Sequence, residues 1–169
     1  CMPITPSPLR YPGGKTIYSE MLMSVIDYND LSNCTFVEAF AGGAGAAITL
    51  LQSGKVKAVF LNDLDPAIYA FWRSILDHTE EFLHRMHCTP ITIKEWYKQR
   101  EIYHSRPDNI LQLGFATFFL NRCNRAGILL ANPIGGIDQT GQDKIDARFK
   151  KEKIEAKIRK IAAQKDAIS

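Results

Sequence analysis

The strongest constraint on the fold is a short apolar segment that runs into a cluster of glycines. Residues 36–41 read Phe-Val-Glu-Ala-Phe-Ala, and Gly42, Gly43 and Gly45 follow before a helix of small residues. Glycines allow a sharp backbone turn and a close approach to a ligand, and the amino end of a helix offers free N–H groups. We therefore predict a buried strand, a glycine turn and a helix. A tight turn that binds nothing is the alternative for this segment taken alone.

A second apolar segment strengthens the prediction of a ligand site. Residues 58–61 read Ala-Val-Phe-Leu and end at Asn62-Asp63. An acid roughly 20 residues beyond the glycine turn is where a doubly wound sheet binds ribose hydroxyls. The predicted fold class is therefore α/β. A nucleotide-binding P-loop is disfavoured, because no Lys-Ser/Thr pair follows the glycines.

Length and composition bound the class of protein. The chain has 169 residues, of which 46% are hydrophobic, enough for one domain with a real core. No apolar run approaches the ~20 residues that span a bilayer. The scattered cysteines form no Cys-x-x-Cys pair, so we expect free thiols and a cytoplasmic protein. These cysteines are Cys1, Cys34, Cys88 and Cys123.

The charge is unevenly distributed along the chain. Residues 143–169 contain nine Lys/Arg and five Asp/Glu, a net charge of +4, whereas the whole chain carries +3 and the remainder therefore −1. A basic end on a neutral body indicates a polyanion partner. An ordinary solvated helix is the alternative.

Apolar periodicity, capping residues and breaker residues predict the other elements. Asp65-Pro66 is typical of a helix start, because the acid caps free N–H groups and proline fits the first turn. Residues 108–125 are apolar on nearly all sides, which predicts a central core helix. Residues 128–141 predict an irregular loop or hairpin that projects from the body. The predicted strands are 35–40 and 57–61, and the predicted helices are 16–28, 46–54, 65–76, 79–88, 92–105, 108–125 and 150–165.

Polar clusters suggest further sites. In the turn-rich residues 8–15, Tyr11 suits stacking on a flat ring and Lys15 suits a carboxylate or phosphate; a plain surface turn is the alternative. Residues 121–125 hold two arginines and two asparagines, which suit phosphates and base edges. A helix carboxyl-terminal cap explains them as well. The His84-x-x-His87-Cys88 spacing lacks the second cluster of a tetrahedral site, so we expect no metal.

Taken together, these segments resemble the Dam-like DNA adenine methyltransferases, the alpha-ordered class that uses S-adenosylmethionine (AdoMet). Residues 9–15 are similar to the family's aromatic-x-Gly-Gly-Lys motif, and residues 36–45 to its Glu-x-Phe-x-Gly motif. Residues 61–65 are similar to the acidic stretch after strand two, and residues 119–133 to the start of the target-recognition region. The resemblance implies a Rossmann-like methyltransferase core with a helical and loop target-recognition insertion. Residues 1–78 would bind AdoMet, and residues 79–169 would form part of the DNA-recognition region.

The resemblance also implies roles for particular residues. Tyr11 would lie against the AdoMet adenine, and Lys15 near the methionine carboxylate. Glu38 and the backbone around Phe40 and Gly42 would hold the methionine end, with Phe40 at the sulfonium. Asp63 would accept the ribose hydroxyls. The candidates for contact with double-stranded DNA are Arg10, Asn121, Arg122, Arg125 and Asn132, together with the loop of residues 128–141. One departure from the family motif is its third glycine, shifted so that Ala44 precedes Gly45.

The family's catalytic tetrapeptide, of the type Asp-Pro-Pro-Tyr, is not found in this sequence, which has no Pro-Pro pair. Two partial matches lack the second proline and the aromatic residue: residues 65–68 and 132–135. We therefore expect an amino-terminal portion of a methyltransferase, without its catalytic half and inactive alone. In the family's sheet the catalytic strand lies beside strand one, so residues 35–41 would present an unpaired apolar edge. That edge predicts self-association or a complementary carboxyl-terminal fragment. A remnant that binds AdoMet or DNA without catalysis is the alternative.

Overall fold

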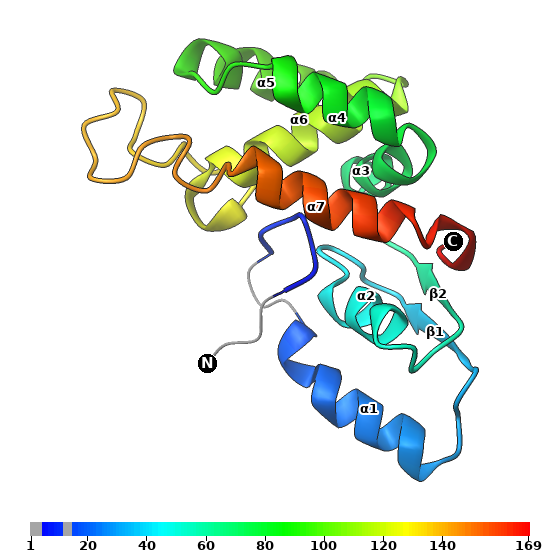
Figure 1. Ribbon diagram of the computed structural model, residues 1–169. Coiled ribbons are helices and arrows are strands. Elements are labelled where there is room, and N and C mark those ends of the chain that lie inside the picture. Colours follow the sequence, from blue (N-terminus) through cyan, green and yellow to red (C-terminus); the bar gives the residue numbers. More distant parts are fainter. Residues whose placement is uncertain (1–4, 12–14) are drawn as a thin grey trace.

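The computed structural model describes residues 5–11 and 15–169. It is a mixed α/β structure in which helices predominate, with a sheet region and a larger helical region (Figure 1). Strands β1 (Thr35–Glu38) and β2 (Ala58–Leu61) pair in parallel, from Thr35 opposite Ala58 to Glu38 opposite Leu61. Helix α2 (Gly45–Gln52) connects them. This strand–turn–helix–strand unit is the one that the sequence predicts.

Both strands are short and partly exposed, whereas the sequence predicts a buried first strand over 35–40. Val37 on β1 is 62% exposed, and Phe60 on β2 is also exposed. Val37 and Phe60 are partners in the strand register and share one face of the sheet, whereas α2 packs on the face of Glu38, which accepts the Ala47 N–H. Within the described part of the chain, no strand other than β2 pairs with β1. The predicted open edge of β1 is therefore present in the structure.

The helix predicted over 16–28 begins as a 3-10 turn, η1 (Lys15–Tyr18), and continues as α1 (Ser19–Tyr28). Its inner side buries Ile26 and packs on α2. Four apolar residues at helical spacing form a stripe that is exposed to solvent: Ile17, Met21, Val25 and Tyr28. The Pro12-Gly13-Gly14 turn of the predicted motif lies outside the described residues.

Four helices follow β2 and form the body of the helical region: α3 (Pro66–Asp77), α4 (Thr79–Cys88), α5 (Ile93–Ser105) and α6 (Ile110–Cys123). The predicted cap is confirmed, because Asp65 Oδ1 accepts the Ala67 N–H at 2.9 Å. Helix α6 is the central helix, as predicted, and packs on α3 and α5. Gly114 permits the α3 contact, since a Cβ there would collide with the backbone of Ala70.

A cluster of aromatic rings fills the core between these helices. Phe71 of α3, Phe82 of α4, and Phe115 and Phe118 of α6 are fully buried. The Phe118 ring lies 5.2 Å from that of Phe82 and 5.3 Å from that of Phe149, both edge-on. Trp96 and Tyr103 are buried too.

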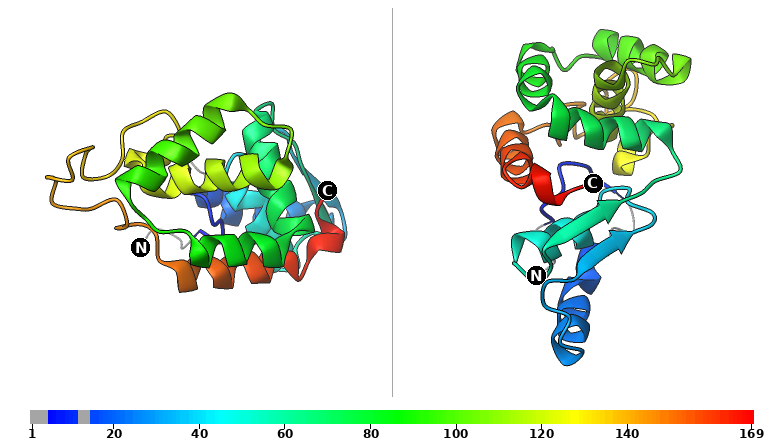
Figure 2. Two further views of the ribbon diagram at one scale, coloured as in Figure 1. Left: turned by 90° about the horizontal axis from the view of Figure 1, so that it is seen from above. Right: turned by 90° about the vertical axis from the view of Figure 1, so that its right-hand side faces the viewer.

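A long irregular segment follows α6 and the 3-10 turn η2 (Arg125–Gly127). Residues 128–141 contain no helix or strand and project from the body in Figure 1, as predicted. The chain then forms α7 (Lys151–Ala162), which buries Ile154, Ile158 and Ile161 against the helical region. Figures 1 and 2 show α7 at the boundary between the helical and sheet regions.

The last described residues return to the sheet after the 3-10 turn η3 (Lys165–Ala167). Ile168 bridges Val59 of β2 in parallel. The Ser169 N–H donates to the Val59 carbonyl at 3.0 Å, and the Leu61 N–H donates to the Ser169 carbonyl at 2.7 Å. Residues 168–169 thus lie along the edge of β2 opposite β1. The helical region is therefore inserted between two neighbouring positions of one sheet.

Two further predictions concern cysteines and membranes. Cys34, Cys88 and Cys123 are free thiols, as their scattered spacing predicts, and Cys1 lies outside the described residues. Among the residues described, none belongs to a helix with the length and apolar character needed to cross a bilayer.

Candidate functional site

A cavity of about 270 Å³ lies at the carboxyl ends of β1 and β2. Its lining includes five of the six residues that the resemblance assigns to the cofactor, Gly42 being the sixth and the neighbour of two lining residues. The lining residues are Tyr11, Lys15, Glu38, Phe40, Ala41, Gly43, Ala44, Gly45 and Asp63. The structure therefore brings together side chains that are up to 52 positions apart, from Tyr11 to Asp63, in the sequence.

The glycine turn that forms the floor of this cavity has two residues with left-handed backbone. Gly42 and Ala44 both have φ of +46°. Ala44 stands where the glycine spacing departs from the family motif. A left-handed backbone at a residue other than glycine reduces the stability of the fold by on the order of 1–3 kcal/mol. The Ala44 N–H donates to the Ala41 carbonyl, and buried neighbours hold the turn in place.

Hydrogen bonds from two other elements hold Gly42. Its N–H donates to Asp63 Oδ2 at 2.8 Å, and its carbonyl accepts the Trp72 Nε1–H at 2.9 Å. The Tyr11 ring lies directly over Gly42, since a Cβ on this glycine would be 2.7 Å from Tyr11 Cζ. Burial, with Asp63 and Asp65 nearby, raises the pKa of the Tyr11 hydroxyl.

The Asp63 carboxylate is fixed by the backbone on both of its oxygens. Oδ2 accepts the Gly42 N–H, and Oδ1 accepts the Asp65 N–H at 3.0 Å. A carboxylate oxygen can accept two hydrogen bonds. Asp63 is therefore oriented by the protein and keeps acceptor capacity for a ligand at the cavity wall.

Glu38 and Lys15 also line the cavity. Glu38 is only 5% exposed, and its Oε2 accepts the Ala47 N–H in the first turn of α2 at 3.2 Å. The Lys15 ammonium donates to Glu38 Oε1 and to the Phe40 carbonyl, both at 2.7 Å. An ammonium has three donors, so one remains for a ligand. Phe40 is 75% exposed, which leaves an apolar ring at the rim of the cavity.

The predicted DNA-contact residues separate into two groups. Asn121 is only 2% exposed, and both of its amide N–H groups and its amide oxygen make hydrogen bonds within the protein. Its Oδ1 accepts the Arg10 N–H at 2.7 Å, and its Nδ2 donates to the carbonyls of Arg10 and Gly127 at 2.7 and 2.9 Å. We therefore remove Asn121 from the DNA contacts, because its geometry is that of a clamp between α6 and the amino-terminal segment. Arg125 and Asn132 are exposed at the base of the projecting loop and stay candidates.

The two remaining arginines also bind backbone carbonyls. Arg10 Nη1 donates to the Asn124 carbonyl at 3.0 Å, and Arg122 Nη1 to the Pro8 carbonyl at 3.3 Å. Both guanidinium groups are therefore held against the protein backbone, an arrangement that the sequence alone does not predict. Both are partly accessible and remain DNA-contact candidates.

Sequence reasoning missed two residues that shape these surfaces. Trp72 holds Gly42, as described above. Asn124 accepts the Trp96 Nε1–H at 2.7 Å and donates to the carbonyls of Ile128 and Leu129, both at 2.9 Å, so it fixes the base of the projecting loop. The indole N–H groups of Trp96 and Trp72 bind partners 28 and 30 positions away, so no local sequence pattern predicts these hydrogen bonds.

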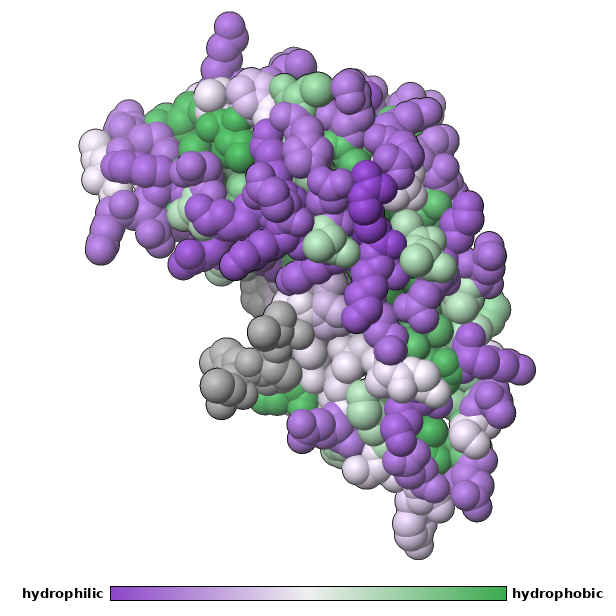
Figure 3. Space-filling model, in the orientation of Figure 1, coloured by the Kyte–Doolittle hydropathy of each residue, from purple (hydrophilic) through white to green (hydrophobic). Residues whose placement is uncertain are grey.

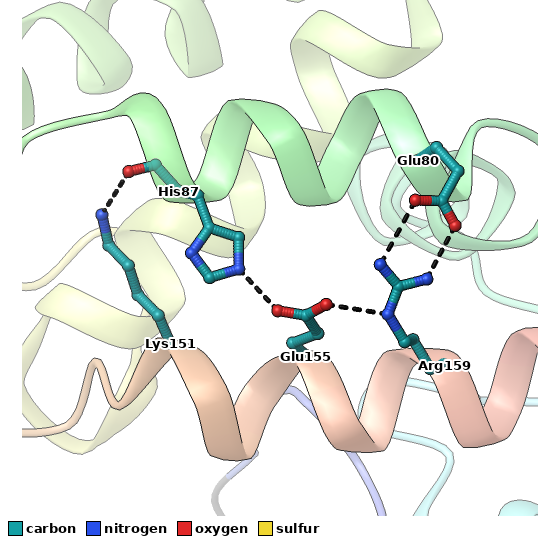
Figure 4. Close-up of polar contacts among 5 residues, drawn as sticks. All are labelled: Glu80, His87, Lys151, Glu155 and Arg159. Carbon is teal, nitrogen blue, oxygen red and sulfur yellow. Dashed lines mark hydrogen bonds and ion pairs between the residues drawn. The ribbon is translucent and has the colours of Figure 1, made fainter.

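The His84, His87 and Cys88 side chains do not converge. Cys88 Sγ lies 3.6 Å from His84 Nε2, whereas His87 turns to α7 and its Nε2 lies 2.6 Å from Glu155 Oε2 (Figure 4). Among residues 5–11 and 15–169, no group of three or more His, Cys, Asp or Glu side chains is arranged to hold a metal ion.

A parallel strand–glycine turn–helix unit, followed by an acid after the second strand, defines an α/β protein with a Rossmann-like core. The pattern of the D12 class N6 adenine-specific DNA methyltransferases matches residues 11–169, and the chain belongs to this family. The resemblance to DNA adenine methyltransferases is thereby confirmed at the level of the family, whose members are enzymes that act on DNA. No curated protein matches the chain.

Proposed function

We propose that this chain binds AdoMet in the cavity between Tyr11 and Asp63 and forms the cofactor-binding part of a site-specific DNA adenine methyltransferase. The observation that carries the proposal is the doubly oriented Asp63 carboxylate beside the left-handed turn at Gly42. A carboxylate in this position suits the two adjacent hydroxyls of a ribose, because each oxygen accepts one further hydrogen bond.

The other lining residues fit the remaining chemistry of AdoMet. The free donor of Lys15 suits the methionine carboxylate, and the negative charge of Glu38 favours the cationic end of the ligand. Tyr11 offers an aromatic face for the adenine, and the exposed ring of Phe40 offers one for the sulfonium. When bound, AdoMet supplies an electrophilic methyl group, and the chain's own residues orient it and exclude water from one side.

Methyl transfer further requires groups that accept a proton and stack on the target adenine, which must leave the duplex to be reached. No Asp-Pro-Pro-Tyr tetrapeptide is present in these 169 residues. We therefore infer that transfer needs a catalytic strand from outside this sequence. The edge of β1 that does not face β2 suits a parallel strand. A second copy of the chain is the alternative occupant.

Calorimetry with AdoMet tests the cofactor assignment. The substitution Asp63→Ala removes the acceptor of two ribose hydroxyls, each bond to a charged group contributing about 1.5–3 kcal/mol, so we expect affinity to fall about 100-fold or more. Asp77→Ala is the matched control, because it removes an exposed carboxylate that pairs with Arg73 on the surface. Unchanged affinity in Asp63→Ala, or no binding by the unaltered chain, would contradict the proposal.

A methyl-transfer assay on adenine-containing duplex DNA tests the second part. We expect no transfer by the 169-residue chain alone and transfer when a carboxyl-terminal fragment carrying the tetrapeptide is added. Transfer by the chain alone would show that its own residues supply the catalytic groups. Cofactor binding without transfer under both conditions would favour the alternative, a binding remnant.

A further inference from the structure

One ion pair links the end of α5 to the segment between β2 and α3. Arg106, the residue after α5, donates from Nη1 to Asp65 Oδ1 at 3.0 Å. Its Nη2 donates to the Tyr103 hydroxyl at 3.0 Å, and its guanidinium lies over the Tyr103 ring, 4.2 Å from the centroid. Tyr103 is only 4% exposed. The guanidinium is therefore anchored on a buried side chain of the helical region while it holds Asp65.

Asp65 connects this ion pair with the cofactor cavity. Its Oδ1 also accepts the Ala67 N–H in the first turn of α3, so two donors hold the side chain. Its backbone N–H donates to Asp63 Oδ1 at 3.0 Å, and Asp63 Oδ2 accepts the Gly42 N–H at 2.8 Å. Because the side chain and the N–H of Asp65 belong to one residue, fixing the first restricts the direction of the second. A continuous chain of contacts therefore runs from Arg106 through both aspartates to the glycine turn.

The backbone of Arg106 is strained. It is left-handed, with φ of +48° and ψ of +57°. Helices often end in a residue of this conformation, but glycine usually occupies the position. Pro107 follows, and a proline favours extended backbone at the residue before it. A strained residue that side-chain contacts hold in place points to a function for that side chain.

The ion pair is better suited to positioning than to stabilising the fold. The side chains of Arg106 and Asp65 are 42% and 34% exposed, and ion pairs with this exposure add little to the free energy of unfolding. Figure 3 shows the surface hollowed on one side between the helical region and the sheet region. The Arg106–Asp65 pair is one of the polar contacts that join α5 to the residues beside the cavity. Its main effect is therefore on the direction of the groups that follow β2.

We propose that Arg106 is a positioning residue of the cofactor site: it holds Asp65, and Asp65 in turn orients the Asp63 carboxylate toward the ligand. This inference rests on the proposed function, in which Asp63 accepts the ribose hydroxyls of AdoMet. Arg106 belongs to the helical region, whereas Asp63 and Gly42 follow the two strands. The helical region therefore helps to set the affinity of the sheet region for its cofactor.

Calorimetry with AdoMet on two variants tests the proposal. Arg106→Ala and Arg106→Gly both remove the guanidinium, and we expect affinity to fall about tenfold in each, as for residues coupled in one hydrogen-bond network. The variants differ in backbone strain, because glycine adopts the left-handed conformation readily and alanine does not. Arg106→Gly should therefore unfold at a higher temperature than Arg106→Ala. Affinity that recovers with stability in Arg106→Gly would overturn the proposal, since the backbone and not the guanidinium would then matter.

A matched control and a double variant sharpen the test. Arg100 also lies on α5 over an aromatic ring, 5.2 Å from the centroid of Trp96, and makes no ion pair within the described residues. Arg100→Ala should keep the original affinity, and an equal loss there would contradict the proposal. In an Asp63→Ala background, Arg106→Ala should lower affinity by no more than about twofold. A full further loss would show that Arg106 acts independently of Asp63.

Hydrogen exchange of the Gly42 amide, measured by NMR without a ligand, separates failure of this inference from failure of the proposed function. The Gly42 N–H donates to Asp63 Oδ2, so its protection reports the orientation of that carboxylate. We expect protection to be lost in both Arg106 variants and kept in Arg100→Ala. If this occurs but the unaltered chain binds no AdoMet, the proposed function fails and the positioning role stands. Unchanged protection would refute the positioning role, whether or not AdoMet binds. If Arg106→Ala does not fold, the comparison of Arg106→Gly with Arg100→Ala decides.

Discussion

The sheet region and the helical region of this chain differ in the large side chains that they bury: aliphatic ones such as Ile48, Leu50 and Val59 in the sheet region, and aromatic rings as well in the helical region. The helical region buries interlocking aromatic rings, with Phe118 in contact with rings from α4, α6 and the segment before α7. The sheet region has two strands of four residues each, and its large side chains Val37, Phe40 and Phe60 are exposed. It is held at the cavity by polar bonds from Glu38, Asp63 and Trp72.

This difference indicates which region contributes most to the stability of the fold and which contributes most to ligand binding. Apolar burial stabilises the helical region whether or not a ligand is present. The bonds around the glycine turn use the carboxylates and ammonium that the proposed cofactor also needs. Changes in the helical core should therefore alter stability, and changes around the turn should alter ligand affinity.

The largest effect should come from the aromatic core. Phe118→Ala removes a fully buried ring, and we expect it to reduce the free energy of unfolding by about 3–5 kcal/mol in urea denaturation followed by circular dichroism. Phe40→Ala, which removes an exposed ring from the sheet region, should change that free energy by no more than about 0.5 kcal/mol. Similar losses in the free energy of unfolding for Phe118→Ala and Phe40→Ala would contradict the difference between the two regions.

An intermediate effect should distinguish the two tryptophans. Trp72→Phe and Trp96→Phe each remove one indole N–H bond and leave a buried acceptor, at a cost of about 1–3 kcal/mol. Only Trp72 holds the glycine turn, so calorimetry should show weaker AdoMet binding, by about tenfold, in Trp72→Phe alone. Equal AdoMet affinities in the two variants would show that the Trp72 hydrogen bond to the Gly42 carbonyl does not contribute to cofactor binding.

The smallest effect concerns the surface contact of α4 with α7. The Arg159 guanidinium bonds Glu80 and Glu155, and these bonds lower the pKa of both carboxyls from the ordinary 4.5 (Figure 4). A lowered folded-state pKa adds stability above the unfolded value and loses it as the pH falls through the folded value. The urea midpoint of Arg159→Gln should therefore fall below that of the unaltered chain at neutral pH, with the gap closing below pH 4.5.

A matched variant controls for the loss of a surface charge. Lys153 lies on the same helix and makes no ion pair within the described part of the chain. The urea midpoint of Lys153→Gln should equal that of the unaltered chain at every pH. A gap for Arg159→Gln that stays constant with pH would exclude the carboxylates as its cause.

Much of the fold follows from local sequence signals. Asp65-Pro66 marks the start of α3, and the isoleucines of α7 repeat at the spacing of a buried face. The exposure of the α1 stripe could not be predicted, because an apolar stripe does not reveal whether anything covers it. The convergence of Lys15, Glu38 and Asp63 was expected through the family resemblance, whereas spacing alone gives no distance between them.

The opposite holds for the polar cluster at the end of α6. Arginine and asparagine side chains serve equally well in a groove-facing surface and in a clamp on backbone carbonyls. The partners of Asn121 are Arg10, which lies 111 positions away, and Gly127. Only the packing of α6 against the amino-terminal segment reveals the clamp.

The pairing of residues 168–169 with β2 has a consequence for how the helical region can vary. The helical region leaves the sheet after Leu61 and returns beside the same strand, so its two attachment points are about 4.8 Å apart, the spacing of neighbouring strands. Because the helical region is joined to the sheet at two adjacent points, its length and surface can change without displacing the strands and the cavity at their ends. The helical region could therefore be lengthened or exchanged while the two strands and the cavity at their ends stay unaltered.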